Sequence, residues 1–418
     1  MKLKPELRAQ VDDKGRLVLP PEIVSRYGLK PGSQIPIDEM ANGLSLRTPH
    51  LKKIYIEPTN RCNLECRTCI RNVWDEPLGK MSEEVFDRVI EDLHTFSPPP
   101  TVSFGGFGEP LFHPNIIGMV TQAKSLGASV ELITNGTLLK ADLSRELITA
   151  GLDRLWISLD GATPESYADV RLGAELPQVV ENITRFRNAI YAEIADIGCC
   201  DFAPISNTQL GIVFVAMKRN IADLPEVIRL GHRLGAKRFI VTNVLPYTKE
   251  MYKEVLYQNA FSYLRSPSLS LPVGMNGFTR ETLYQVMHSD THVIPPVSNL
   301  QGSNDRCPFI ESGAGVIGWD GSFSPCLPLL HSHTSYIFEF ERFSRRWAIG
   351  NIAEHSLFDL WNAPEHLAFR ERVQTFDFPS CVDCLSCELL ENNEEDCYGN
   401  DFPTCGGCLW AQGIIQCP

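Results

Sequence analysis

Three cysteines early in the chain have a spacing that is typical of a metal-binding loop. Cys62, Cys66 and Cys69 form a C-x3-C-x2-C pattern directly after an apolar segment at 53–57. A loop of this kind closes three thiolates around one small object, and three thiolates bind three irons of a [4Fe–4S] cluster. The fourth iron is then open to a substrate. A zinc ion with a remote fourth ligand is the alternative.

Glycine and polar motifs lie at the ends of the next apolar segments, in the order FGGFGEP, TNG and SLDG. Glycines let a ligand approach the backbone, a glutamate accepts from an ammonium group, amides and hydroxyls bind sugar hydroxyls, and an arginine offers a fork to a carboxylate. The residues concerned are Gly106, Gly108, Glu109, Asn135, Ser158 and Arg171. Each motif alone is typical of an ordinary turn or surface, but their order along the chain predicts one ligand site.

A second set of cysteines lies near the end of the sequence, within 307–417. It comprises Cys307, Cys326, Cys381, Cys384, Cys387, Cys397, Cys405, Cys408 and Cys417. These nine exceed the roughly eight thiolates that two fully ligated cubane clusters need, and one or two zinc ribbons are the alternative. His331 and His333 lie between them and are expected to be ordinary surface histidines. Cys199 and Cys200 stand apart as expected buried or free thiols.

The elements that must position these residues alternate between apolar strand-like and helix-like segments. Strands are expected at 53–57, 101–104, 128–133, 154–159, 210–217 and 237–243, and helices at 82–96, 113–126, 141–150, 175–195 and 221–234. This alternation predicts an α/β fold with a parallel sheet and outer helices, either a partial (β/α)6 barrel or an open sheet. The predicted domains are a β-rich module at 1–50, an α/β core at 51–245, a connector at 246–306 and a Cys-rich domain at 307–418.

Composition and charge argue against several classes of protein, among them general nucleic-acid binders and membrane proteins. The net charge of −13 over 418 residues is unfavourable for general nucleic-acid binding and for a polybasic membrane patch. No apolar run approaches the ~18 residues of a membrane-spanning helix, and the start of the chain lacks the apolar stretch of a secretory signal. We therefore expect a cytoplasmic protein, in which the many cysteines are metal ligands rather than disulfides.

The motif set at 51–245 resembles the radical S-adenosylmethionine (SAM) superfamily, and the hairpin that delivers Cys326 resembles the SPASM extension. The resemblance implies a partial (β/α)6 radical SAM barrel in which Cys62, Cys66 and Cys69 hold a SAM-binding [4Fe–4S] cluster. It also implies that Gly106, Gly108 and Glu109 hold the SAM amine, Arg171 its carboxylate, and Asn135 and Ser158 its ribose. The later cysteines would hold two auxiliary [4Fe–4S] clusters. Reductive cleavage of SAM to a 5′-deoxyadenosyl radical, followed by hydrogen abstraction, is the implied reaction.

A closer resemblance is to the radical SAM maturases of tungsten-cofactor oxidoreductases. It implies action on a tungstopterin cofactor or on its oxidoreductase, with a reductant such as ferredoxin or flavodoxin. Residues 9–48 resemble an AbrB-like swapped-hairpin module, which implies homodimerisation more than DNA binding. The alternatives are a peptide-modifying maturase of the SPASM type and, from another class, a zinc- and DNA-binding regulator.

Overall fold

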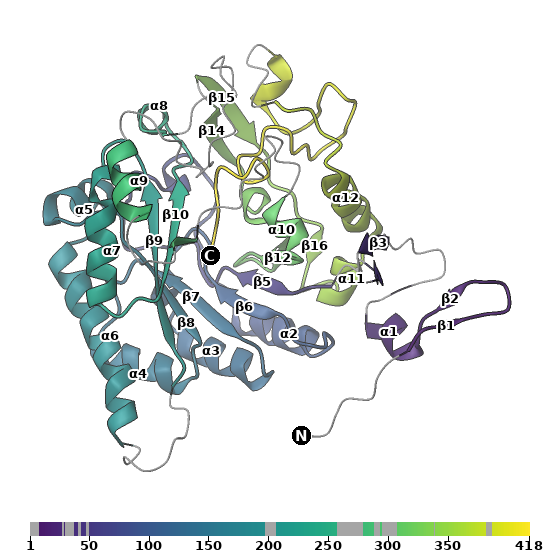
Figure 1. Cartoon of the computed structure of the whole chain (residues 1–418), viewed down its shortest axis with the longest axis horizontal. Coiled ribbons are helices and arrows are strands. Elements are labelled where there is room, and N and C mark those ends of the chain that lie inside the picture. The colour runs from purple at the N-terminus through teal and green to yellow at the C-terminus, as the bar shows by residue number, and fades with distance from the viewer. Residues whose placement is uncertain are drawn as a thin grey trace.

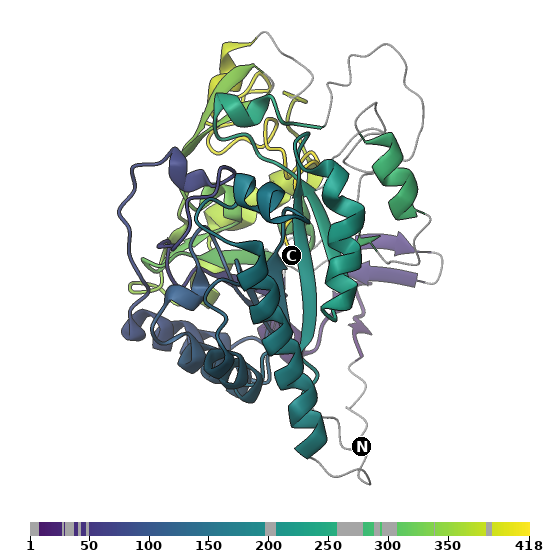
Figure 2. The same cartoon turned by 90° about the vertical axis from the view of Figure 1, so that its left-hand side faces the viewer.

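The structure is a computed structural model that describes residues 8–26, 29, 37–40, 43–46, 50–196, 206–256, 279–287, 293–294, 307–337, 339–381 and 387–418. A large twisted sheet forms its centre, with helices along its outer side and the C-terminal elements packed above one end (Figures 1 and 2). Cys199, Cys200 and Cys384, and most of the expected connector, lie outside the described residues.

The sheet has ten strands in the order β11-β10-β9-β8-β7-β6-β5-β12-β13-β16. Six consecutive strands, from β5 to β10, pair in parallel and in sequence order. Their bounds are β5 (Lys53–Ile56), β6 (Thr101–Phe104), β7 (Val130–Thr134), β8 (Arg154–Ser158), β9 (Gln209–Ala216) and β10 (Arg238–Asn243). The six strands predicted from the apolar segments are thus confirmed, each within about two residues.

Helices connect these strands and bury their apolar faces on the sheet. They are α2 (Glu83–Leu93), α3 (Ile116–Ser125), α4 (Ala141–Thr149), α5 (Pro164–Val170), α6 (Leu176–Asp196) and α7 (Leu224–Arg233). Helix α2 begins where the Ser82 side chain accepts a hydrogen bond from the Val85 amide, which is a usual N-cap. Only the short α5 was not expected from the sequence. The arrangement places the carboxyl ends of the parallel strands at one edge, where α/β proteins bind ligands.

The cysteine-rich region continues the same sheet. Strand β12 (Ala314–Ile317) pairs in parallel with β5, and β13 (Ser322–Ser324) and β16 (Gly350–Asn351) extend the sheet with antiparallel pairs. The remaining elements here are α10 (Pro308–Glu311), η4 (Leu327–Leu329), β14 (His333–Ile337), β15 (Phe340–Ser344), α11 (Leu357–Trp361), α12 (Pro364–Thr375) and η5 (Glu388–Glu391). The C-terminal region therefore shares a backbone ladder with the first strand of the core.

Several short elements complete the described chain. They are β1 (Gln10–Val11), β2 (Leu17–Val18), α1 (Pro21–Arg26), β3 (Ile37–Met40), β4 (Gly43–Leu46), η1 (Ile70–Asn72), η2 (Pro110–Phe112), η3 (Ile221–Asp223), α8 (Lys249–Tyr252), α9 (Arg280–Met287) and β11 (Val293–Ile294). The first two strands and the next two form separate antiparallel hairpins. Their β-rich character was expected, whereas an AbrB-like swap between two copies stays a prediction. Among the described residues, no helix has the length and apolarity needed to span a bilayer.

Candidate active site at the carboxyl ends of the strands

The cysteine loop leaves the carboxyl end of β5 and is fixed by hydrogen bonds to the segment before α2. Asn60 accepts from the Gly79 amide at 2.8 Å and donates to the Pro77 carbonyl at 2.9 Å. Further along the loop, the Cys69 amide donates to the Cys66 carbonyl, which closes a turn between the second and third cysteines. The three thiols lie close enough to influence one another electrostatically. The predicted trio is therefore brought together on one loop.

The glycine loop at 105–108 packs directly on the start of the cysteine loop. A Cβ atom added to Gly108 would lie 2.1 Å from the Thr59 carbonyl oxygen, and one added to Gly106 would lie 2.7 Å from the Glu57 side chain. Gly106 also has a φ of +150°, which few other residues adopt. Both glycines are required by close approach of two loops. The same absence of side chains leaves backbone exposed towards the cavity beside them.

Glu109 is buried at the base of this cavity with its carboxylate largely engaged. Its Oε1 accepts from the Thr134 hydroxyl at 2.7 Å and the Leu111 amide at 3.0 Å, and its Oε2 accepts from the Asn135 amide at 2.8 Å. Burial raises the pKa of Glu109, although these three donors oppose the shift. A carboxylate has about four acceptor positions, so one is left for a ligand.

Asn135 faces the cysteine loop. Its side-chain Nδ2 donates to the Asn63 Oδ1 at 3.1 Å and lies 3.8 Å from the Cys62 Sγ, while its Oδ1 accepts from Thr137. The sequence motif placed Asn135 in the site, but it did not reveal these partners. The amide thus helps to orient the first cysteine.

Arg171 is held by Asp160, an acidic residue that sequence reasoning missed as a site residue. Arg171 is nearly buried, donates through Nε to the Asp160 carboxylate at 2.6 Å, and places Nη1 3.8 Å from the Cys66 Sγ. Asp160 is fully buried and also accepts from the Val215 amide at 2.7 Å. The signal for Asp160 was present in SLDG, where it is the second residue after Ser158. Most of the guanidinium fork is therefore occupied within the chain.

A cavity of about 200 Å³ collects these residues at the strand ends. Its lining includes all three cysteines of the first loop and all six predicted ligand-binding residues: Cys62, Cys66, Cys69, Gly106, Gly108, Glu109, Asn135, Ser158 and Arg171. Tyr247, which follows β10, also lines it. No motif marked this tyrosine, and only the position of its segment after a strand could have suggested it.

The first cysteine loop has the donor set that an iron–sulfur cluster needs. Burial raises the pKa of Cys62 and raises that of Cys69 to about 11. Cluster iron bound to these sulfurs would favour their thiolate form. Within the described residues, no three His, Cys, Asp or Glu side chains could hold a single metal ion.

Four of the later cysteines surround a second cavity of about 50 Å³ between the C-terminal elements. They are Cys307, Cys326, Cys405 and Cys408. Burial raises the pKa of all four thiols, that of Cys307 to about 12. Four sulfurs around one cavity are the full ligand set of a cubane cluster.

The other late cysteines divide into a third group and one separate residue. Cys381 interacts electrostatically with Cys387 and Cys397. Arg342 is buried and faces sulfurs of both this group and the preceding one, and it forms no ion pair within the described ranges. Cys417 lies apart, where its Sγ accepts from the Trp410 indole at 3.4 Å. Its assignment as a ligand stays a prediction.

Comparison with known families and proteins assigns the chain to a family. The profile of the radical SAM superfamily matches residues 56–204, and that of an iron–sulfur cluster-binding domain, SPASM, matches 307–388. A curated protein of Pyrococcus furiosus, the tungsten-containing aldehyde ferredoxin oxidoreductase cofactor-modifying protein, is 30% identical over 88% of this chain and 97% of its own length. The chain belongs to the radical SAM superfamily. This radical SAM protein is therefore an enzyme, and SAM and [4Fe–4S] clusters are its cofactors.

More distant relatives agree with the fold. The Fe-coproporphyrin III synthase of Methanosarcina barkeri is 22% identical over 83% of this chain and 86% of its own length. Among solved structures, SAM-bound SuiB of Streptococcus suis has a TM-score of 0.55 at 17% identity, covering 84% of this chain and 74% of that one. The anSMEcpe structure with SAM and a peptide has a TM-score of 0.51 at 16% identity, covering 88% and 96%. The predicted radical SAM core with a SPASM-type C-terminal region is confirmed.

The positions of His331 and His333 correct one sequence expectation. Both side chains are 3% exposed and are not surface histidines. His331 contacts two carboxylates, Glu57 and Glu76, and the His333 Nδ1 donates to the His331 carbonyl at 2.9 Å. The sequence places these residues in a loop-like stretch, and their burial depends on contacts with the distant core.

Proposed function

We propose that this enzyme cleaves SAM reductively and uses the 5′-deoxyadenosyl radical to abstract hydrogen during maturation of a tungsten cofactor or of the oxidoreductase that contains it. The observation that carries the chemistry is the shared cavity of Cys62, Cys66 and Cys69 with the six ligand-binding residues. A [4Fe–4S] cluster on these cysteines would supply an open iron and the electron for cleavage.

The roles of the ligand-binding residues follow from their present partners. The backbone beside Gly106 and Gly108 and the remaining acceptor position of Glu109 would hold the SAM amine. Ser158 would bind a ribose hydroxyl. Arg171 would meet the SAM carboxylate through Nη1 alone, because Asp160 occupies its Nε and Nη2. Asn135 would reach the ribose by exchanging its bond to Asn63.

The proposed auxiliary sites follow the cysteine groups of the C-terminal region. Cys307, Cys326, Cys405 and Cys408 would hold one [4Fe–4S] cluster. Cys381, Cys387 and Cys397 would hold the second together with Cys384. These two clusters would pass electrons to or from the first cluster, and a reductant such as ferredoxin or flavodoxin would supply the electrons.

Support for the target comes from the Pyrococcus furiosus relative, whose name specifies modification of the cofactor of a tungsten-containing aldehyde ferredoxin oxidoreductase. The similarity runs over nearly the whole length of both chains, so it includes the C-terminal region that would face a substrate. The peptide-modifying alternative receives support only at the level of fold, because SuiB is 17% identical to this chain.

The test uses the anaerobically purified, reconstituted enzyme with SAM, a reductant and an immature tungsten oxidoreductase from cells that lack this enzyme. We expect 5′-deoxyadenosine to form, and mass spectrometry to detect a changed pterin cofactor or a changed oxidoreductase chain. The Cys66→Ala variant is the matched control. Absence of 5′-deoxyadenosine from the reconstituted enzyme would reject the chemistry. Cleavage with no change in either cofactor or polypeptide would reject the tungsten target.

A further inference from the structure

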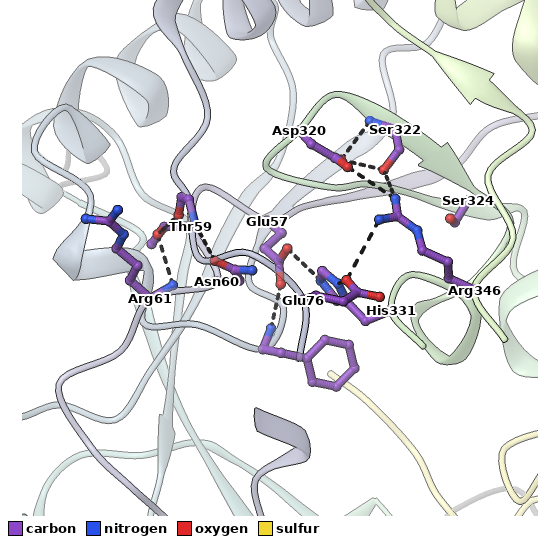
Figure 3. Close-up of polar contacts among 12 residues, drawn as sticks. Glu57, Thr59, Asn60, Arg61, Glu76, Asp320, Ser322, Ser324, His331 and Arg346 are labelled. Atoms are coloured by element: carbon purple, nitrogen blue, oxygen red, sulfur yellow. Dashed lines mark hydrogen bonds and ion pairs between the residues drawn. The ribbon is translucent and has the colours of Figure 1, made fainter. Parts of the chain in front are cut away.

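A buried histidine of the C-terminal region bridges two carboxylates of the core (Figure 3). The His331 Nε2 lies 2.9 Å from the Glu57 Oε2, and its Nδ1 lies 2.5 Å from the Glu76 Oε2. His331 is 3% exposed and Glu57 is fully buried. A neutral imidazole has one donor nitrogen, whereas a protonated ring has two. With both carboxylates ionised, only the imidazolium form donates to the two of them at once.

The inner carboxylate links this histidine to the glycine loop. Glu57 directly follows β5, and its Oε1 accepts the Phe107 amide at 3.0 Å. The same side chain occupies the space where a Cβ on Gly106 would lie. Glu57 thus fixes the backbone of the loop that contains Gly106 and Gly108. The contacted residue, Phe107, lies two positions before Glu109.

The outer carboxylate is held by the C-terminal region. Glu76 accepts the Ser332 amide at 2.8 Å and lies 3.8 Å from the Arg346 guanidinium. Arg346 in turn donates to Asp320 at 3.2 Å and to the Ser322 hydroxyl at 2.9 Å (Figure 3). These contacts fix the far side of the imidazole, so the ring cannot turn without breaking several hydrogen bonds.

Aromatic rings enclose the bridge. The Trp74 ring centroid lies 4.4 Å from that of His331, and the Phe107 centroid lies 5.7 Å away, both edge-on. Exclusion of water strengthens the attraction between the imidazolium and its carboxylates. The residue that donates its amide to Glu57 therefore also covers the histidine with its side chain.

We propose that His331 is a positioning residue of the active site, which fixes Glu57 and thereby holds the Phe107 amide and the glycine loop against the cysteine loop. The proposal rests on the proposed function to the extent that this loop binds SAM. According to this proposal, SAM affinity depends on the contact between His331 of the C-terminal region and Glu57 of the core. These two residues are 274 positions apart in sequence.

The protonation of His331 agrees with this geometry. Burial alone would lower the pKa of His331, but the hydrogen bonds and charges of Glu57 and Glu76 raise it to about 9. The other ionisable groups around the bridge are Arg346 and Asp320, through Glu76, and His333, whose pKa burial lowers to about 4. The ring is therefore charged, and its neighbour His333 neutral, throughout the neutral range.

The first test measures hydrogen exchange in the full chain without SAM. In His331→Gln, the glutamine amide cannot bridge both Glu57 and Glu76, so Glu57 holds the Phe107 amide less firmly. We expect this amide to exchange about tenfold faster, the effect of losing about one internal hydrogen bond. The double variant His331→Gln/Glu57→Gln should exchange no faster than Glu57→Gln alone. Unchanged Phe107 exchange in a folded His331→Gln protein would overturn the proposal.

The matched control is Glu131→Gln. Glu131 is a buried carboxylate of β7 whose side chain pairs with two cations, Lys53 and Arg154, rather than with the His331 bridge. We expect this variant to lose thermal stability and to keep the Phe107 exchange rate of the wild type. An equal acceleration in both variants would show a general loss of stability and would reject a positioning role. If His331→Gln does not fold, Glu76→Gln perturbs the same bridge from its other end and should also accelerate exchange of the Phe107 amide.

The second test separates this inference from the proposed function. We expect His331→Gln to weaken SAM binding to the reconstituted protein about tenfold, while the cleavage rate at saturating SAM changes little. Faster Phe107 exchange with unchanged SAM affinity would reject the link to SAM. If even the wild-type protein fails to bind SAM, the proposed function fails, whereas the exchange result still decides whether His331 holds the loop.

Discussion

Substitution of Gly108 by alanine tests whether the contact between the glycine and cysteine loops sets the geometry of the site. The added Cβ would lie 2.1 Å from the Thr59 oxygen, 2.7 Å from the Arg61 oxygen and 2.8 Å from the Asn60 carbonyl carbon. All three are backbone atoms, so no side chain can move aside. Ordinary carbon contacts are about 3.5 Å or longer, and the two loops must separate by about 1 Å.

That separation should affect stability modestly and function strongly. Overpacking of this kind costs about 1–3 kcal/mol of unfolding free energy. It would also disturb the hydrogen bond from the Glu109 amide to the Arg61 carbonyl, 2.8 Å in the wild type. A displacement of about 1 Å in a positioned site can reduce the rate about 100-fold. We therefore expect Gly108→Ala to fold and to lose most SAM cleavage.

The assay compares 5′-deoxyadenosine formation, SAM affinity and thermal unfolding with those of Gly127→Ala. Gly127 has a φ of +74° and nothing within 4 Å of an added Cβ. Alanine there costs about 1–2 kcal/mol through the left-handed backbone, far from the site. Equal activity of the two variants at similar stability would refute the claim that loop contact positions the ligand.

Three further predictions address the other parts of the site. Cys66→Ala should abolish SAM cleavage while retaining the fold, because the first cluster loses one of its three thiolates; turnover detected by chromatography would reject the assignment. Cys405→Ala should lower the iron content by about four per chain and remove product formation but leave uncoupled SAM cleavage, and a full iron content would contradict its role as a ligand. The thermal midpoint of the wild type should exceed that of His331→Gln most at pH 6, because the raised pKa of about 9 gives stability that is complete below the ordinary value of 6.5 and is lost as pH rises through 9. A difference that does not shrink between pH 7 and 10 would show that His331 is not charged in the folded state.

The sequence was sufficient for the parts of the fold and site that depend on local pattern. The apolar segments located β5 to β10 because strands buried on both faces are nearly continuous apolar runs. The motifs after them located the lining of the cavity because the carboxyl ends of parallel strands meet at one edge. Both inferences need only short stretches of chain and one rule of topology.

Contacts between distant segments could not be predicted in this way. Nothing in AGVI at 314–317 indicates that it pairs with β5, and nothing near His331 indicates burial against Glu57. The grouping of Cys405 and Cys408 with Cys307 has the same origin, since about one hundred residues separate them along the chain. A spacing motif indicates cysteines that share one loop, whereas this group of cysteines is brought together by the tertiary fold.

Strand β5 joins the C-terminal region to the core beside the candidate active site. It pairs with β6 of the core on one side and with β12 of the C-terminal region on the other. The Glu57 amide, at its end, donates to the Ile317 carbonyl at 2.9 Å, while the Glu57 side chain contacts His331 and Phe107. A displacement of the C-terminal region would therefore be transmitted through β5 to both the cysteine loop and the glycine loop. An auxiliary region that is displaced or partly folded should weaken SAM binding even when all three cysteines of the first loop are intact.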